Sequence, residues 1–209
     1  HHLPGHSLDH IVIGTPDGVC FAGDALLTEN VLRHVKLPYC DHVGLDLESK
    51  EAITKLPYQH WILSHKGPFD GNIRELADKN MDLVRLRLAE LAKLLQRPMT
   101  RDEFYQESRR LIGMHIGTYD QLIRQERHLR PYLEQLVIDG TTRLEVKNDT
   151  IYFYSFCMNF HSPVVIVSEN THTPPQIPRF PLPSRRSGNM FLTAPEYVPT
   201  MPPPPRRLR

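Results

Sequence analysis

Histidine is concentrated at the start of the chain, in positions that suit metal ligands. Eight of the twelve histidines of this 209-residue chain lie in its first 65 residues. Three short segments each place one His or Asp beside a glycine at the boundary of an expected element: Leu3-Pro4-Gly5-His6-Ser7, Ala22-Gly23-Asp24 and Leu63-Ser64-His65-Lys66-Gly67. Neutral imidazole is the commonest nitrogen ligand of zinc, and carboxylate oxygen completes mixed sites. The candidate metal ligands are therefore His6, Asp24 and His65.

The elements that must position these residues follow from the local pattern. Residues 11–13 and 19–23 are expected to be strands joined by a tight turn, because Pro16 and Gly18 suit the second and last turn positions. A short helix is predicted over residues 47–56, with Asp46 or Ser49 as its N-cap. The apolar run at 61–64 predicts a strand that ends directly before His65. A strand, a helix and a strand with polar residues at the strand ends are typical of an α/β fold.

Residues 71–139 have a helical period. Apolar residues three and four positions apart predict one helix over 73–95. Thr100 and Glu103 form a capping-box pattern that opens a second helix, which ends near Gly113. A third helix is expected from Thr118 to about residue 139, kinked or restarted at Pro131.

A hairpin is predicted where residues 143–146 and 151–154 pair. Helices followed by such a two-stranded ribbon resemble a winged-helix module.

The end of the chain has a different composition. The last 47 residues hold twelve of the 19 prolines and keep no hydrophobic period, so we expect them to be disordered with polyproline character. Residues 202–207 (Pro-Pro-Pro-Pro-Arg-Arg) weakly match an SH3-type ligand. The abrupt change after Phe156 indicates a tail foreign to the domain, such as a read-through or frameshifted one.

Charge and cysteine content narrow the class of protein. The net charge is +1, but the last 47 residues carry about +4 and leave residues 1–162 mildly acidic, which disfavours nucleic acid as the main partner. No apolar run is long enough to cross a membrane.

Cys20, Cys40 and Cys157 are odd in number and widely spaced, as expected in a reducing compartment. The chain has no initial methionine and no secretory signal, so we expect a cytoplasmic location and a cut amino-terminal end.

Residues 3–67 resemble the metallo-β-lactamase superfamily. That family has a Pro-Gly-His segment, then a strand pair ending in Gly-Asp, then a helix and a strand ending in histidine. The three segments occur here in that order, 18 and 41 residues apart. The resemblance implies the carboxy-terminal half of an αββα sandwich over residues 1–70. A helical, winged-helix-like region would follow over 71–156, and a disordered Pro/Arg-rich tail over 157–209.

The resemblance also implies a chemistry. His6 matches a ligand of the first metal, Asp24 the carboxylate that bridges both metals and acts in catalysis, and His65 a ligand of the second. The expected activity is hydrolysis by a metal-activated water, with two zinc ions in an intact relative and iron or manganese as alternatives. The substrate would be a small molecule or an ester, thioester or phosphodiester.

One part of the family pattern is absent. The first family motif, His-x-His-x-Asp-His, does not occur in this sequence. Three ligands remain of the usual seven, shared between two metals. We therefore expect this chain to be incomplete, to bind metal weakly and to show little or no turnover.

Alternatives exist for several of these assignments. Asp24 could cap a helix at residues 25–27, and His6 and His65 could be ordinary loop histidines. His10, His34, His42 and His60 are interpreted as structural or solvent-facing. The apolar stripe of helix 73–95 could form a homodimer, although packing in the core is favoured. The alternative function is a winged-helix module that binds nucleic acid or protein through Arg124, Arg127, His128 and Arg130 without catalysis, although a solvated face is preferred for these residues.

Overall fold

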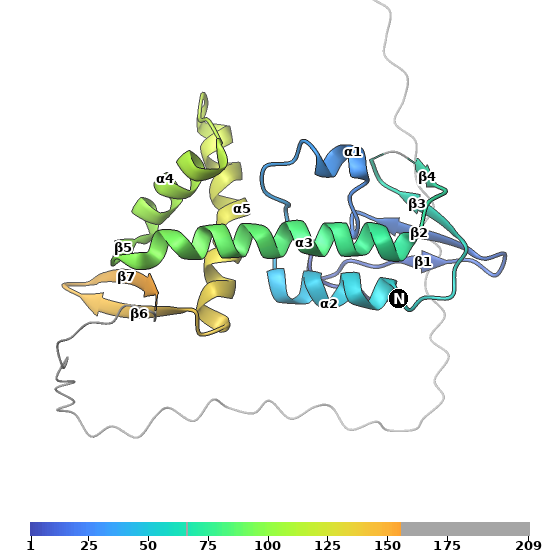
Figure 1. The fold of residues 1–209 in the computed structure, drawn as a ribbon, viewed down its shortest axis with the longest axis horizontal. Coiled ribbons are helices and arrows are strands. Elements are labelled where there is room, and N and C mark those ends of the chain that lie inside the picture. Colours follow the sequence, from blue (N-terminus) through green and yellow to red (C-terminus); the bar gives the residue numbers. More distant parts are fainter. Residues whose placement is uncertain (66, 156–209) are drawn as a thin grey trace, which may run out of the picture. The chain divides into compact units, whose positions relative to one another are not determined.

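The computed structural model describes residues 1–65 and 67–155. Its elements in chain order are β1 (Ile13–Gly14), β2 (Val19–Gly23), α1 (Glu29–Leu32), α2 (Val43–Ile53), β3 (His60–Leu63), β4 (Gly67–Phe69), α3 (Ile73–Ala92), a 3-10 turn (Lys93–Gln96), β5 (Met99–Thr100), α4 (Arg101–Ile112), α5 (Tyr119–Ile138), β6 (Thr142–Lys147) and β7 (Thr150–Ser155). Figure 1 shows α3 running between two separate sheets.

The first sheet has the strand order β1-β2-β3-β4. β1 and β2 form the expected antiparallel hairpin, with Ile13 paired to Phe21. β2 and β3 are parallel, and their register ends with Gly23 opposite Leu63. Because parallel strands finish at the same edge of a sheet, the residues that follow β2 and β3 are brought side by side.

The amphipathic helix α3 contributes to two hydrophobic clusters. Leu76 and Ala77 in its first half pack with the first sheet, whose core includes Trp61. Val84 and Leu91 in its second half pack with α4 and α5. The stripe that could have formed a dimer therefore lies mainly in the core, as the favoured alternative predicted.

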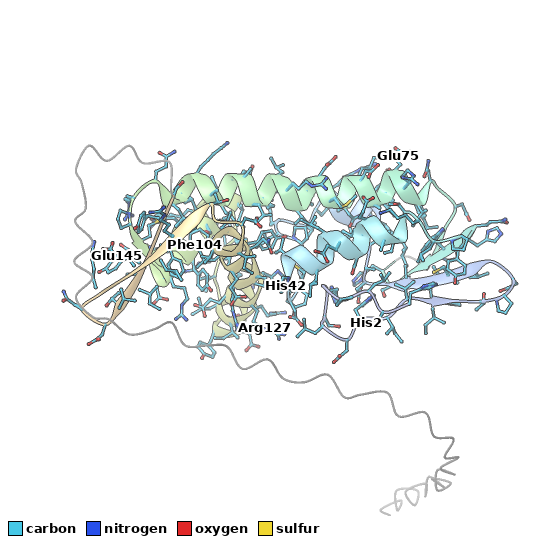
Figure 2. The ribbon with its side chains drawn as sticks, turned by 90° about the horizontal axis from the view of Figure 1, so that it is seen from below. His2, His42, Glu75, Phe104, Arg127 and Glu145 are labelled. Carbon is cyan, nitrogen blue, oxygen red and sulfur yellow. The ribbon has the colours of Figure 1, made fainter. Side chains whose placement is uncertain are left out.

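The second sheet has the order β5-β7-β6 and is antiparallel. Its β6–β7 hairpin turns through Asn148 and Asp149, which both have positive φ; short polar side chains tolerate this backbone better than most. Phe104 of α4 is fully buried in the cluster beside this sheet, and Figure 2 shows it among packed side chains.

The second predicted helix is confirmed in detail. The Thr100 hydroxyl accepts from the Glu103 backbone N–H, and the Glu103 carboxylate accepts from the Thr100 N–H, which completes a capping box. The helix ends at Gly113, whose left-handed backbone (φ 68°) satisfies the last turn. Both end signals depend on residues a few positions apart, so the sequence alone was sufficient to predict where this helix begins and ends.

The predicted bounds and cap of the helix at residues 47–56 were wrong. α2 begins at Val43 rather than at residue 47, and His42 is its N-cap, accepting from the Leu45 N–H. Asp46 and Ser49 do not cap: Asp46 is buried against Lys50, and Ser49 donates to the Pro4 carbonyl. The helix expected from Thr118 to about residue 139 is α5, which continues through Pro131 without a restart.

The predicted properties of the tail, including the match at residues 202–207, lie outside the described residues. Within the described part, no helix is both long and apolar enough to span a bilayer.

Candidate functional site

Asp24 is placed between the two candidate histidines. Its Oδ2 lies 3.8 Å from Nε2 of His6, and its Oδ1 lies 3.0 Å from Nε2 of His65. About a third of the Asp24 side chain is exposed. The structure therefore brings the three predicted side chains together, with one imidazole at each oxygen of a single carboxylate.

The segment that carries His6 is fixed on α2. Gly5 has φ +143°, and a Cβ at this position would lie 2.3 Å from the Cα of Asp46, so only glycine allows so close an approach. The Gly5 carbonyl accepts from the Asp41 N–H at 2.8 Å, and Ser49 Oγ donates to the Pro4 carbonyl at 2.6 Å. The backbone of Pro4 and Gly5 is therefore held against α2, which fixes the position from which the His6 side chain extends.

Parallel pairing positions the other two side chains. The Ser64 N–H donates to the Gly23 carbonyl at 3.1 Å, which joins the ends of β2 and β3. Gly23 has φ +57° and turns the chain sharply, so that Asp24 projects from the strand end beside His65. Asp24 does not cap a helix, because α1 begins at Glu29 with Thr28 as its N-cap.

One oxygen of the Asp24 carboxylate has no hydrogen-bond donor in the part of the chain that the structure describes. Asp24 Oδ1 is buried and receives no hydrogen bond from any described residue, although His65 Nε2 lies 3.0 Å away. The two atoms are close, but they are not oriented for a hydrogen bond. A buried carboxylate oxygen without a donor is costly. This oxygen and the nearby imidazole nitrogen of His65 are both donors that a divalent transition metal accepts.

The described residues do not form a complete metal site. Within residues 1–65 and 67–155, no group of three or more His, Cys, Asp or Glu side chains is arranged to hold a metal ion. Each oxygen of Asp24 faces a different imidazole, so each half of the site has two protein donors. Zinc sites in proteins usually have three or four.

His10 lies beside the site, although it was predicted to be an ordinary histidine. Its ring lies edge-on to that of His6, with centroids 5.9 Å apart, and its Nε2 is 3.1 Å from the position of a Cβ on Gly23. Burial, followed by the nearby His6, lowers the pKa of His10. His10 adjoins no glycine, so the pattern used to select ligands missed it, whereas its spacing of four from His6 could have indicated it.

Tyr39 and His128 are two further residues that the sequence pattern did not select as part of the site. Tyr39 lies edge-on to His6 with centroids 5.2 Å apart, and His128 of α5 lies against Tyr39 at 5.0 Å. The Tyr39 hydroxyl donates to Asp41 at 2.6 Å and accepts from Arg127 at 3.0 Å. Figure 2 shows Arg127 on α5.

The basic residues of α5 are thus engaged within the chain. Arg127 bonds Tyr39, and Arg130 pairs with Glu134 at 2.7 Å. A helix presented to a DNA groove would keep such side chains for the nucleic acid. No observation supports the winged-helix binding module, which stays a prediction.

Other histidines are placed elsewhere. His34 bonds the Asn30 carbonyl, and His42 caps α2. His1 bonds the Tyr58 hydroxyl and His2 the Leu8 carbonyl.

A cavity of about 200 Å³ opens at the site. Asp24, His6 and His65 line one part of it, and apolar side chains of residues 27–38 line another. His128 from α5 also contributes. The three candidate ligands therefore face a space that a small ligand could enter.

The structure is similar to solved metallo-β-lactamase structures. A metallo-β-lactamase family protein from Thermus thermophilus matches with a TM-score of 0.55 and 22% identity, over 74% of this chain and 48% of that one. A β-lactamase domain protein from Burkholderia ambifaria matches with a TM-score of 0.56 and 19% identity, over 73% and 45%. Scans against protein-family models and curated proteins found no match.

These similarities show the fold. The described chain has a metallo-β-lactamase-like α/β fold, as the sequence resemblance predicted. The chain spans about half the length of the solved structures it matches.

Proposed function

We propose that this chain carries part of the site of a metal-dependent hydrolase that uses an activated water. The observation that supports it most is the placement of Asp24, with one imidazole at each oxygen and no hydrogen bond to Oδ1 from the described residues. The fold of the structural neighbours agrees with this proposal. Zinc is the ion that imidazole and carboxylate donors suit well, with iron and manganese as alternatives.

Each residue has a defined part in the proposed site. His6, Asp24 and His65 would hold the metal, with Asp24 between the two imidazoles. A carboxylate suits the position between the imidazoles because it supplies oxygen donors and a negative charge that attracts a cation. Divalent ions held there would lower the pKa of a water to about 7 and polarise the substrate.

The surrounding residues maintain this arrangement. Tyr39 and His10 contact the His6 ring edge-on, which limits its rotation. Hydrogen bonds on the Pro-Gly segment fix the backbone below it. A ligand that is already oriented loses less entropy on binding, so these contacts favour metal binding without touching the metal.

Calorimetric titration of zinc into the full chain tests the proposal. We expect weak binding, because each half of the site has two protein donors. Asp24→Ala should abolish it, since this residue serves both halves, and His6→Ala or His65→Ala should each remove part of it. His34→Ala is the matched control, because His34 bonds the Asn30 carbonyl away from the site.

The result that would overturn the proposal is zinc binding that Asp24→Ala leaves unchanged. Absence of zinc binding by the unsubstituted chain would also count against it. Circular dichroism of each variant shows whether the fold is kept, so loss of binding can be assigned to the ligand.

A further inference from the structure

A second cavity, of about 510 Å³, is lined by residues of α4, α5 and the β6–β7 hairpin, together with the start of α2. Its volume falls within the range of about 300–1,000 Å³ that is usual for small-molecule sites. It shares no lining residue with the cavity at Asp24. A ligand of this second cavity would therefore bind independently of the proposed metal site.

One part of the second cavity is an apolar surface that is open to solvent. The register of the hairpin pairs Leu144 with Phe153 and Val146 with Ile151, so these four side chains share one face. Leu144 is 52% exposed, Ile151 is 49% exposed, and Ile138 at the end of α5 is 64% exposed. These three side chains line the cavity. Exposed apolar side chains gathered in this way gain free energy when hydrocarbon covers them.

Tyr105 of α4 supplies an unpaired hydroxyl at the same cavity. Tyr105 is only 4% exposed and packs in the core beside Phe104. It also lines the cavity, and its hydroxyl forms no hydrogen bond with any described residue, although a buried tyrosine usually has a partner. Burial raises the pKa of Tyr105, so the hydroxyl keeps its proton at neutral pH. It is therefore a donor for which the described residues provide no acceptor.

Two arginines border the cavity beside Tyr105. The guanidinium carbon of Arg101 lies 5.9 Å from the centroid of the Tyr105 ring, and its guanidinium contacts Asp102 at 3.4 Å. Arg130 donates from Nε to Glu134 at 2.7 Å, which leaves its two terminal nitrogens without a hydrogen bond to the described residues. The charged residues that line the cavity are these two arginines and Glu134. Their formal net charge is +1, which suits a ligand with one negative charge.

We propose that the second cavity binds an amphipathic monocarboxylate, such as the anion of a medium-chain fatty acid. The carboxylate would bind at Tyr105 and the two arginines, because the planar guanidinium group matches the two oxygens of a carboxylate. The Tyr105 hydroxyl adds a further donor. The hydrocarbon tail would cover Leu144, Ile151 and Ile138. A small anion would leave the apolar surface open, and an uncharged hydrocarbon would leave the donors unused.

The test compares probes that carry only some of these features. Octanoate is titrated into the full chain while NMR follows the methyl signals of Ile138, Leu144 and Ile151. Octyltrimethylammonium has the same tail with the opposite charge, and acetate has the same head without the tail. We expect octanoate to shift the three signals saturably and octyltrimethylammonium to bind at least about fivefold more weakly. Acetate should leave the signals unchanged at the concentrations that saturate octanoate binding.

Variants locate the head of the ligand. Tyr105→Phe keeps the buried ring and removes the hydroxyl, so it should weaken octanoate binding at least about threefold. Arg130→Gln should weaken it at least about fivefold, because a charged donor is lost. Arg85→Gln is the matched control and should leave the affinity unchanged. Arg85 also pairs with an acidic residue one turn away, Asp82, but does not line the cavity.

Three results would overturn this proposal. The first is the absence of a saturable shift with octanoate, or equal affinities for octanoate and octyltrimethylammonium. The second is octanoate binding that Tyr105→Phe and Arg130→Gln both leave unchanged. The third would assign the surface to a second copy of the chain: dimer formation in sedimentation velocity, with the same methyl signals shifting as protein concentration rises and octanoate having no effect. Because no metal is added, these outcomes are separate from those of the zinc titration.

Discussion

The ring of Tyr39 lies edge-on to the ring of His6, with centroids 5.2 Å apart. Tyr39 is in turn held by Asp41 and by Arg127 of α5 through its hydroxyl. The orientation of a candidate metal ligand near the start of the chain therefore depends on a helix more than a hundred residues later.

Tyr39→Phe keeps the ring contact and removes both hydrogen bonds of the hydroxyl. We expect the free energy of unfolding to fall by about 1 kcal/mol and zinc affinity to fall slightly. Tyr39→Ala should lower zinc affinity more, because the ring that restrains His6 is gone. Urea denaturation and calorimetry measure the two effects. Equal zinc affinity in Tyr39→Ala and the unsubstituted chain would refute the restraint.

Gly5→Ala should disrupt the segment that carries His6. The new Cβ would lie 2.3 Å from the Asp46 Cα, at a φ of +143°, so we expect a loss of at least about 2 kcal/mol of stability and weaker zinc binding. Gly18→Ala is the matched control. Gly18 also has a positive φ (+83°) but has nothing within 4 Å of the added atom, so its smaller loss isolates the effect of the clash. Similar losses would show that the close approach to α2 is unimportant.

The two described cysteines should be unreactive in the folded protein. Burial raises the pKa of Cys20 to about 11 and that of Cys40 to about 12, and the thiolate is the reactive form. In a Cys157→Ser background, a thiol reagent at pH 8 should label neither residue until guanidinium unfolds the chain. Raising the pH to 9 should change little, because it stays below both pKa values. Rapid labelling at pH 8 would contradict this.

The sequence predicted the local features well. The capping box of Thr100 and Glu103 and the turn before β2 depend on residues a few positions apart. The interactions that form them can therefore be read from the local sequence. The helix 73–95 was recognised by its period, although its last turn is a 3-10 turn. The metallo-β-lactamase-like fold followed from three short segments in order.

Long-range contacts were harder to predict. Asp46 looked like a cap, but its partner Lys50 and the approach of Gly5 bury it. Tyr39 and His128 reach the neighbourhood of His6 only because the chain folds, and nothing in their local sequence marks them. His10 could have been found from its spacing of four from His6. The positions of His6, Asp24 and His65 were selected correctly as neighbours, whereas their role as ligands stays a prediction.

The most direct test of the metal site is paramagnetic broadening by cobalt(II), which replaces zinc in imidazole and carboxylate sites. At saturating cobalt, the ring protons of His6 and His65 should broaden most, and both effects should vanish in Asp24→Ala. His1 and His2, beside the terminal amine, are the competing place for adventitious binding, and their ring protons are followed in the same spectra. Broadening that centres on His1 and His2, or that persists at His6 and His65 in Asp24→Ala, would contradict a site built around the Asp24 carboxylate.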